Sequence, residues 1–154
     1  MAVTLALDLG TTTGWAIELP GGDKISGSQS FKPDRYSGAG MRFLRFRGWL
    51  DELHSTYPVD VLYYEEVRRH AGVDAAHCYG GFMAHLQAWA ESSQVPYAGI
   101  PVGTIKKYAT GKGNANKEAM MQAMIDKGHR PVDDNEADAI ALLYYSLTLS
   151  QSVN

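Results

Sequence analysis

Residues 3–19 read VTLALDLGTTTGWAIEL, two β-rich apolar runs on either side of a turn. The runs are residues 3–9 and 15–19, and the turn between them spans residues 10–14. Two apolar runs joined by a short glycine-containing segment predict a β-hairpin. The alternating side chains of residues 25–31 predict a third, edge-like strand, so we expect three consecutive antiparallel strands at the start of the chain.

The rest of the chain alternates between helical and strand patterns. Apolar residues at three- and four-residue spacing predict amphipathic helices, and short continuous apolar runs predict buried strands. In chain order we expect a helix at 41–57, a strand at 59–64, a helix at 74–92, a strand at 95–100, and helices at 104–109, 117–127 and 135–149. This order predicts an α/β fold with a five-stranded mixed sheet that is flanked by helices on both faces.

Length and composition narrow the class of protein. The 154 residues have the size of one domain, and we expect residues 1–154 to form it. Cys78 is the single cysteine, so an intrachain disulfide is excluded and a zinc ribbon lacks its ligands. No apolar stretch approaches 18 residues, and the N-terminal run is interrupted early by Asp8. We therefore expect neither a signal peptide nor a membrane span, and a cytoplasmic location.

Three carboxylates lie where a charge is costly. Asp8 lies inside the first apolar run, Glu65 closes the central strand, and Asp138 lies within an apolar helix. Because these runs contain no Lys or Arg, a divalent cation is a suitable partner, since hard cations bind carboxylate oxygens. Asp8 could also cap the turn that follows it, and Glu65 or Glu66 could be a solvated strand end. Asp138 is too deep in its helix for such an interpretation.

The combination of four segments resembles a known family. ALDLGTTTGWAI, VLYYEEV, GTIKKYATGKGNANKEAM and DDNEADAIALL, in this order and spacing, resemble the RuvC-type Holliday junction resolvases of the RNase H-like nuclease superfamily. The resemblance covers nearly the whole chain, and it leaves open whether the protein is of the bacterial or the phage type. It implies an RNase H-like, RuvC-like fold and a crossover junction endodeoxyribonuclease. Such an enzyme is a metal-dependent homodimer in which each subunit hydrolyses one strand of a four-way DNA junction.

The resemblance also implies roles for individual residues. Asp8, Glu65 and Asp138 match the catalytic carboxylates that hold the metal, and the strand-Glu-polar-Val pattern selects Glu65 over Glu66. Asn135, one helical turn before Asp138, stands where the family has an acidic or His ligand, and Asp134 or Glu136 could contribute through water. Two Mg²⁺ ions are implied, with Mn²⁺ able to substitute, and two ions can activate water and stabilise the leaving oxygen.

Lys117 closes the glycine-containing segment 111–117 and matches a catalytic family lysine that brings positive charge to the scissile phosphate. Its simpler interpretation is a residue in the first turn of a helix that Asn116 caps. Asp133 and Glu136, three residues apart, resemble a capping box at the start of the last helix, which is also a purely structural interpretation.

The net charge of −3 argues against nucleic acid at face value, yet the charge is unevenly distributed. Residues 32–47 carry a net charge of +4, as do residues 103–117, whereas residues 133–138 carry −4. Basic segments of this kind can also be ordinary solvated surface, but here they flank the predicted metal site. The residues expected to bind DNA are Arg42, Arg45, Arg68, Arg69, Lys106, Lys107 and Lys112.

Residues 76–90, AHCYGGFMAHLQAWA, are strongly apolar, and Gly80-Gly81 would permit close helix approach. The resemblance places the homodimer interface on this helix, while its pattern also suits a core helix on the sheet. The main alternatives are a flap-type or general branched-DNA nuclease, or a nuclease for RNA/DNA hybrids. Asn135 suggests an inactive junction-binding module, which fits less well because the three acidic residues are present. The segment DLGTTTG suggests an actin-like ATPase, which fits less well because 154 residues cannot hold two ATPase domains.

Overall fold

The computed structural model describes residues 2–151 of the chain, with side chains through residue 149. A five-stranded sheet lies at its centre in the order β3-β2-β1-β4-β5. The strands are β1 (Thr4–Asp8), β2 (Thr12–Glu18), β3 (Lys24–Ser30), β4 (Val61–Glu66) and β5 (Tyr97–Pro101). β1, β2 and β3 form an antiparallel meander, as predicted, while β4 pairs in parallel with β1 and β5 pairs in parallel with β4.

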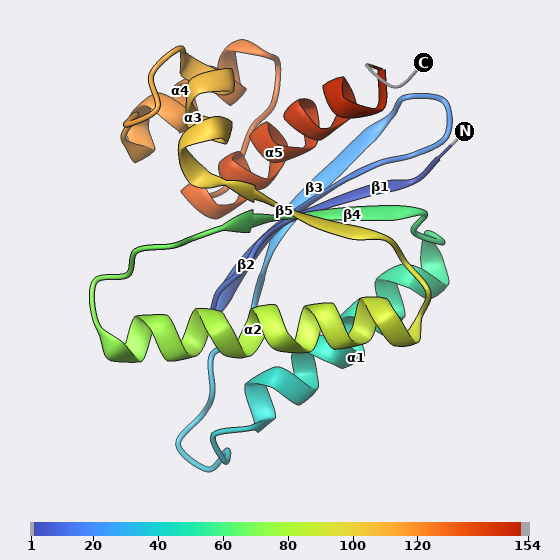
Figure 1. The fold of residues 1–154 in the computed structure, drawn as a ribbon, viewed down its shortest axis with the longest axis vertical. Coiled ribbons are helices and arrows are strands. Elements are labelled where there is room, and N and C mark those ends of the chain that lie inside the picture. The colour runs from blue at the N-terminus through green and yellow to red at the C-terminus, as the bar shows by residue number, and fades with distance from the viewer. Residues whose placement is uncertain (1, 152–154) are drawn as a thin grey trace.

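Helices cover both faces of this sheet (Figure 1). On one face lie α1 (Met41–Thr56) and α2 (Val73–Ser92). On the other face lie α3 (Val102–Thr110), α4 (Lys117–Asp126) and α5 (Asp134–Gln151). The α/β class and the mixed sheet flanked on both faces are thus confirmed. None of the described helices is long and apolar enough to span a bilayer.

Alternation along β1 creates two hydrophobic cores, one on each side of the sheet. Leu5 and Leu7 join the core beneath α1 and α2, whereas Ala6 joins the core beneath α3, α4 and α5. The same alternation runs through β4, where Leu62 and Tyr64 face the α1–α2 side. Since successive side chains of a strand point to opposite faces, odd- and even-numbered residues of β1 and of β4 face different cores.

Several boundaries differ from the sequence prediction. β2 begins at Thr12, inside the predicted turn, because edge strand β3 supplies ladder partners for this end of β2. The turn is therefore shorter than expected. The helix predicted at 104–109 begins at Val102, directly after β5, and the strand predicted at 59–64 spans 61–66. Leu44 fits the three- and four-residue apolar spacing that predicts the helix at 41–57, yet it is 64% exposed, because the buried side of α1 is formed by Phe46, Leu50 and Leu53.

The two glycines of α2 have different surroundings. A Cβ at Gly81 would lie 2.5 Å from the Phe43 ring, so Gly81 allows α1 and α2 to pack closely. A Cβ at Gly80 would meet nothing within 4 Å. The close helix approach predicted for the two glycines therefore occurs within the chain, between α1 and α2 at Gly81. Gly80 has open space around it.

Candidate active site

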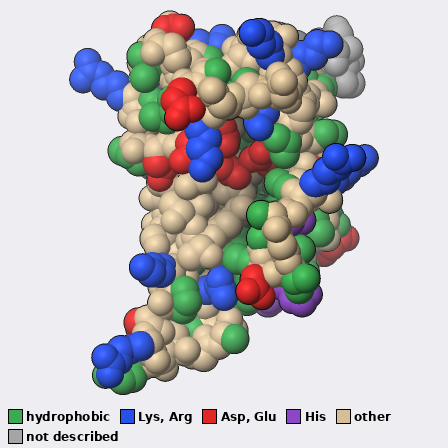
Figure 2. All heavy atoms as spheres, turned by 90° about the vertical axis from the view of Figure 1, so that its left-hand side faces the viewer, with side chains coloured by type: hydrophobic (Ala, Val, Ile, Leu, Met, Phe, Trp, Pro, Cys, Tyr) green, Lys and Arg blue, Asp and Glu red, His purple; other side chains and the backbone are tan. Residues whose placement is uncertain are grey.

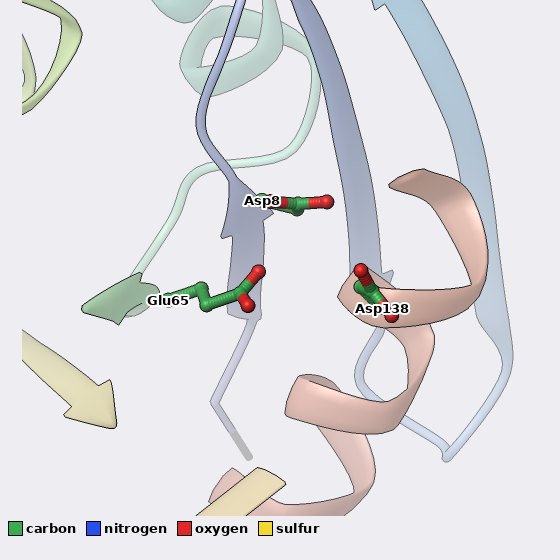
Figure 3. A group of neighbouring side chains, drawn as sticks. All are labelled: Asp8, Glu65 and Asp138. Atoms are coloured by element: carbon green, nitrogen blue, oxygen red, sulfur yellow. The ribbon is translucent and has the colours of Figure 1, made fainter. Parts of the chain in front are cut away.

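Asp8, Glu65 and Asp138 come together at one end of the sheet, although they are far apart in sequence. Each offers a carboxylate oxygen, and these oxygens all lie within 4.8 Å of one another. Figure 3 shows the three side chains converging from β1, β4 and α5. Glu65 is buried, while Asp8 and Asp138 are partly exposed. The cluster is therefore recessed but open to solvent.

Strand parity and register explain the meeting of the first two carboxylates. Asp8 follows Ala6 by two residues and so faces the α5 side of the sheet. In the parallel β1–β4 ladder Leu7 pairs with Tyr64, which brings the next residues, Asp8 and Glu65, side by side. By the same parity Glu66 points to the other face, where its carboxylate pairs with Arg68 at 3.0 Å. The structure thus brings Glu65, and not Glu66, to Asp8.

Gly14 allows the third carboxylate to approach. α5 crosses β1 and β2, and a Cβ at Gly14 would lie 1.8 Å from the backbone oxygen of Asn135. Only a residue without a side chain lets the first turn of α5 rest on β2 at this point. The sequence analysis treated Gly14 as part of a turn and missed this role. A glycine inside a β-rich run was the signal that could have revealed it.

The electrostatics of the cluster favour a bound cation. Burial raises the pKa of Asp8 well above its ordinary value, and the negative charges of Glu65 and Asp138 raise it further. Burial and the charges of Glu65 and Asp134 raise the pKa of Asp138 to about 7, although Lys106 and Lys117 oppose this shift. The carboxylates therefore repel one another in a partly desolvated place, and a divalent cation would relieve that repulsion.

The residues at the start of α5 differ in what they can add. Asp134 lies close enough for its charge to raise the pKa of both Asp8 and Asp138. Glu136 is committed elsewhere, because it accepts hydrogen bonds from the Ser26 hydroxyl at 2.6 Å and the Val132 amide at 2.8 Å. A contribution of Glu136 to the metal site through water stays a prediction, and each of its carboxylate oxygens already accepts one of these hydrogen bonds. Its pairing completes the capping arrangement predicted for this helix.

Asn135 lies one turn before Asp138 on α5, and its backbone packs on Gly14. The other half of the capping arrangement comes from Asp133, whose carboxylate accepts a hydrogen bond from the Glu136 amide at 2.8 Å. The position of Asn135 next to the cluster agrees with the expected helix face. Whether its side chain binds metal stays a prediction.

Lysines border the acidic cluster on the α3–α4 side. Lys117 is 79% exposed and lies 3.7 Å from Asp134, at the start of the α4 helix that Asn116 caps by accepting from the Ala119 amide. Lys106 acts on the pKa of Asp138, whereas Lys107 and Lys112 are exposed on the same part of the chain. Figure 2 shows Asp and Glu side chains gathered on this face with Lys and Arg around them.

The predicted DNA-binding arginines fall into two groups. Arg68 and Arg69 are exposed and line a hollow of about 380 Å³ with Pro101 and Gly103, directly beyond the carboxyl ends of β4 and β5. Arg42 is partly buried, and Arg45 is exposed within 3.9 Å of the Asp34 carboxylate. Arg68 and Arg69 therefore lie just beyond the end of β4 that carries Glu65, whereas Arg42 and Arg45 lie in the first turns of α1.

Tyr79 is a positioning residue that the sequence analysis missed. Its buried hydroxyl, on α2, donates to the backbone oxygen of Glu65 at 2.7 Å and accepts from the Val67 amide at 3.1 Å. Burial raises the pKa of Tyr79 to about 12, so the hydroxyl stays protonated. The contact holds the end of β4 in place. Its sequence signal is weak, because an aromatic residue in an apolar helix usually indicates core packing.

The sheet, with its meander of three antiparallel strands and two further parallel strands, has helices on both faces and the acidic cluster at one end, which is the arrangement of the RNase H-like fold. The chain matches no family model and no curated protein sequence. Among solved structures it is similar to Thermus thermophilus RuvC in complex with a Holliday junction substrate. The two share 20% identity over 92% of this chain and 90% of that chain, with a TM-score of 0.77.

Two further structures have the same fold. The T. thermophilus RuvC structure shares 21% identity over 91% of this chain and 90% of that chain, with a TM-score of 0.69. The yeast mitochondrial Holliday junction resolvase Ydc2 shares 12% identity over 90% of this chain and 75% of that chain, with a TM-score of 0.61. The chain therefore has the RuvC-like form of the RNase H-like fold, as the sequence predicted.

Proposed function

We propose that the chain is a Holliday junction resolvase, a metal-dependent endonuclease that hydrolyses phosphodiester bonds in four-way DNA junctions. The observation that carries this proposal is the convergence of Asp8, Glu65 and Asp138 on a RuvC-like fold. The single nuclease domain would comprise residues 1–154, act in the cytoplasm, and serve DNA recombination and repair. Its products would carry a 5′ phosphate and a 3′ hydroxyl.

The three carboxylates fit a divalent cation. Oxygens that share one Mg²⁺ or Ca²⁺ at 2.0–2.6 Å lie at most about 4–5 Å apart, and the observed limit of 4.8 Å agrees with this. Asp8, Glu65 and Asp138 would hold Mg²⁺, with two ions per site and Mn²⁺ as a substitute, and Asn135 would supply a further, uncharged oxygen. When bound, these ions supply Lewis acidity and a nucleophilic water.

The other residues of the site would act on the DNA itself. Lys117 would place its charge beside the scissile phosphate, where negative charge develops during hydrolysis. The exposure of Lys117 suits this role, because its pairing with Asp134 is a solvent-exposed contact of small energy that DNA could replace. Exposed Arg68, Arg69 and Lys112 would bind backbone phosphates on either side and so orient the cleaved strand.

A homodimer would place two such sites on one junction, which has two strands to cut. We propose that the outer face of α2 forms the dimer interface, because the open surface at Gly80 permits a second helix to approach. Sedimentation of the purified chain tests this. A dimer that Gly80→Arg dissociates, while Gly38→Arg leaves it intact, supports the interface.

The decisive experiment compares wild type with Glu65→Gln and with the matched control Glu66→Gln. Labelled four-way junction, splayed duplex and linear duplex serve as substrates in Mg²⁺ or Ca²⁺. We expect wild type with Mg²⁺ to cut the junction preferentially and Glu65→Gln to lose at least about 100-fold in rate, the size of effect seen when a single charge-stabilising group is removed. Glu66→Gln should stay within a few-fold.

Each other result of this experiment favours a different function for the protein. Equal cutting of linear duplex and junction contradicts the resolvase proposal and favours a general nuclease. Preferential cutting of splayed DNA or of RNA/DNA hybrid favours the corresponding branched-DNA or hybrid nuclease. Tight junction binding without cutting in Mg²⁺ or Mn²⁺ favours the inactive binding module.

A further inference from the structure

The loop between β3 and α1, residues 31–40, displays an aromatic ring to solvent. Tyr36 is 84% exposed, more than any other large hydrophobic side chain in the described part of the chain. The guanidinium carbon of Arg35 lies 5.0 Å from the centre of this ring. The loop projects from the end of the molecule below α1 and α2 in Figure 1, and Lys and Arg side chains lie at this lower end of the face drawn in Figure 2, away from the gathered Asp and Glu side chains.

The exposed ring belongs to a hydrogen-bonded turn. The Asp34 carboxylate accepts hydrogen bonds from the Tyr36 amide at 2.8 Å and from the Ser37 hydroxyl at 3.0 Å. The Tyr36 hydrogen bond is the main reason that the pKa of Asp34 is lowered from its ordinary value. Arg45 of α1 contacts both Asp34 and Ser37. The turn therefore fixes the backbone from which the Tyr36 ring projects into solvent.

Both ends of the loop are attached to Thr11, three residues beyond Asp8. The Phe31 amide donates to the Thr11 backbone oxygen at 2.6 Å, and the Arg42 guanidinium donates to the Thr11 hydroxyl at 3.2 Å. Five residues separate Phe31 from Tyr36, and an extended chain of that length spans about 17 Å. The ring therefore lies within about 20 Å of the Thr11 backbone, which is about six nucleotide steps at 3.4 Å per step.

The chemistry of the loop selects a nucleic acid as its partner. Residues 32–47 carry a net charge of +4, which suits a phosphate backbone. The exposed aromatic surface of the loop is one flat ring with a cation beside it, which suits a base and its adjacent phosphate.

We propose that residues 32–40 form a second DNA contact, in which Tyr36 stacks on an unstacked base of branched DNA and Arg35 binds the adjacent phosphate. This inference rests on the proposed function and adds to it the part of the substrate that is recognised outside the site of cleavage. Duplex DNA offers no unstacked base away from its ends, so the contact would favour branched over linear substrates.

Binding is measured in the Glu65→Gln background with Mg²⁺, on a four-way junction that carries 2-aminopurine at the branch. We expect Tyr36→Ala to weaken the dissociation constant by about 5- to 150-fold, the range that base–aromatic stacking supplies. Tyr36→Trp should bind within about threefold of the parent. Val132→Ala, at a 77% exposed apolar residue of another loop, is the matched control and should change nothing.

The 2-aminopurine signal separates stacking from mere proximity. The parent and Tyr36→Trp should quench the fluorescence at one branch position, and Tyr36→Ala should not. Equal binding and equal quenching by Tyr36→Ala and the parent would overturn the proposal.

Asp34 provides a test in which charge and structure have opposite effects. Asp34→Asn keeps the hydrogen-bond acceptor and removes a negative charge, so it should bind the junction as tightly as the parent or more tightly. Asp34→Ala removes the same charge together with the turn, and it should bind more weakly. Tighter binding by Asp34→Ala would mean that only charge matters, and it would contradict an ordered Tyr36 contact.

Failure of this inference is distinguishable from failure of the proposed function. If the chain with Glu65 intact neither binds nor cuts the junction, the proposed function is wrong. If that chain cuts the junction and Tyr36→Ala does so with unchanged affinity, the loop contact alone is wrong.

Discussion

Replacing Asp138 by Asn should stabilise the metal-free protein at pH 8 and at the same time abolish cleavage. Burial and the nearby charges of Glu65 and Asp134 raise the pKa of Asp138 from 3.8 to about 7. Between these two pH values the folded state binds more protons than the unfolded state, so the free energy of unfolding falls as pH rises. Above pH 7 the ionised carboxylate is a net cost to the fold.

The size of this cost follows from the shift. About three pKa units at about 1.36 kcal/mol each give an upper limit of about 4 kcal/mol. Partial exposure of Asp138 reduces the repulsion, and Asn keeps the shape of the side chain while it removes the charge. We therefore expect Asp138→Asn to raise the free energy of unfolding by about 1–4 kcal/mol at pH 8, and by less than about 1 kcal/mol at pH 4.5.

Urea unfolding in EDTA at the two pH values measures this difference, with Asp23→Asn in the exposed β2–β3 turn as the control. Saturating Mg²⁺ should stabilise wild type and leave Asp138→Asn almost unchanged, because a ligand that binds the folded state raises its stability. If Asp138→Asn is less stable than wild type in EDTA at pH 8, or if its gain is equal at pH 4.5, an uncompensated carboxylate is not the cause.

Three further changes test other parts of the site. Gly14→Ala should displace α5, lower the free energy of unfolding by at least about 1–3 kcal/mol and remove Mg²⁺-dependent cleavage. Gly38→Ala, at a position with open space around it, is the control and should melt like wild type. Equal melting temperatures of the two variants would show that α5 does not rest on residue 14. Tyr79→Phe leaves two backbone groups at the end of β4 without their hydrogen-bond partner, so thermal unfolding should show a free energy of unfolding lower by about 1–3 kcal/mol. Junction cleavage by this variant should show a lower kcat with KM nearly unchanged. A changed KM alone would argue against a positioning role. The double variant Arg68→Ala/Arg69→Ala should bind the junction more weakly and reduce the slope of log affinity against log salt by about two; an unchanged slope would place both side chains away from the phosphates.

The elements of the fold were largely predictable because their signals are local. Periodicity of two and of about 3.6 residues located the strands and helices, and the errors fell at boundaries where a long-range partner decides. Thr12 and Thr13 resemble a turn in sequence, and they form a strand because β3 lies beside them. Leu44 matches a helical apolar pattern, yet α1 rotates it away from the core.

The candidate site was predictable in part for the same reason. A carboxylate inside an apolar run is conspicuous, and Asp8 and Asp138 were found in this way. The choice between Glu65 and Glu66 depended on resemblance, since neighbouring residues of a strand differ only in the face to which they point. The hydrogen bond of Glu136 to Ser26 could not be predicted, because the two residues lie 110 positions apart along the chain.

The sequence by itself determined that this chain forms an α/β fold and places acidic groups where charge is costly, since both depend on the pattern of neighbouring residues. The tertiary structure decided that three of those groups share one place. The parallel pairing of β1 with β4 sets Asp8 beside Glu65, and the contact of α5 with Gly14 brings Asp138 to both. Such contacts join residues far apart in the chain, and they depend on register and close packing, which only the folded chain as a whole specifies.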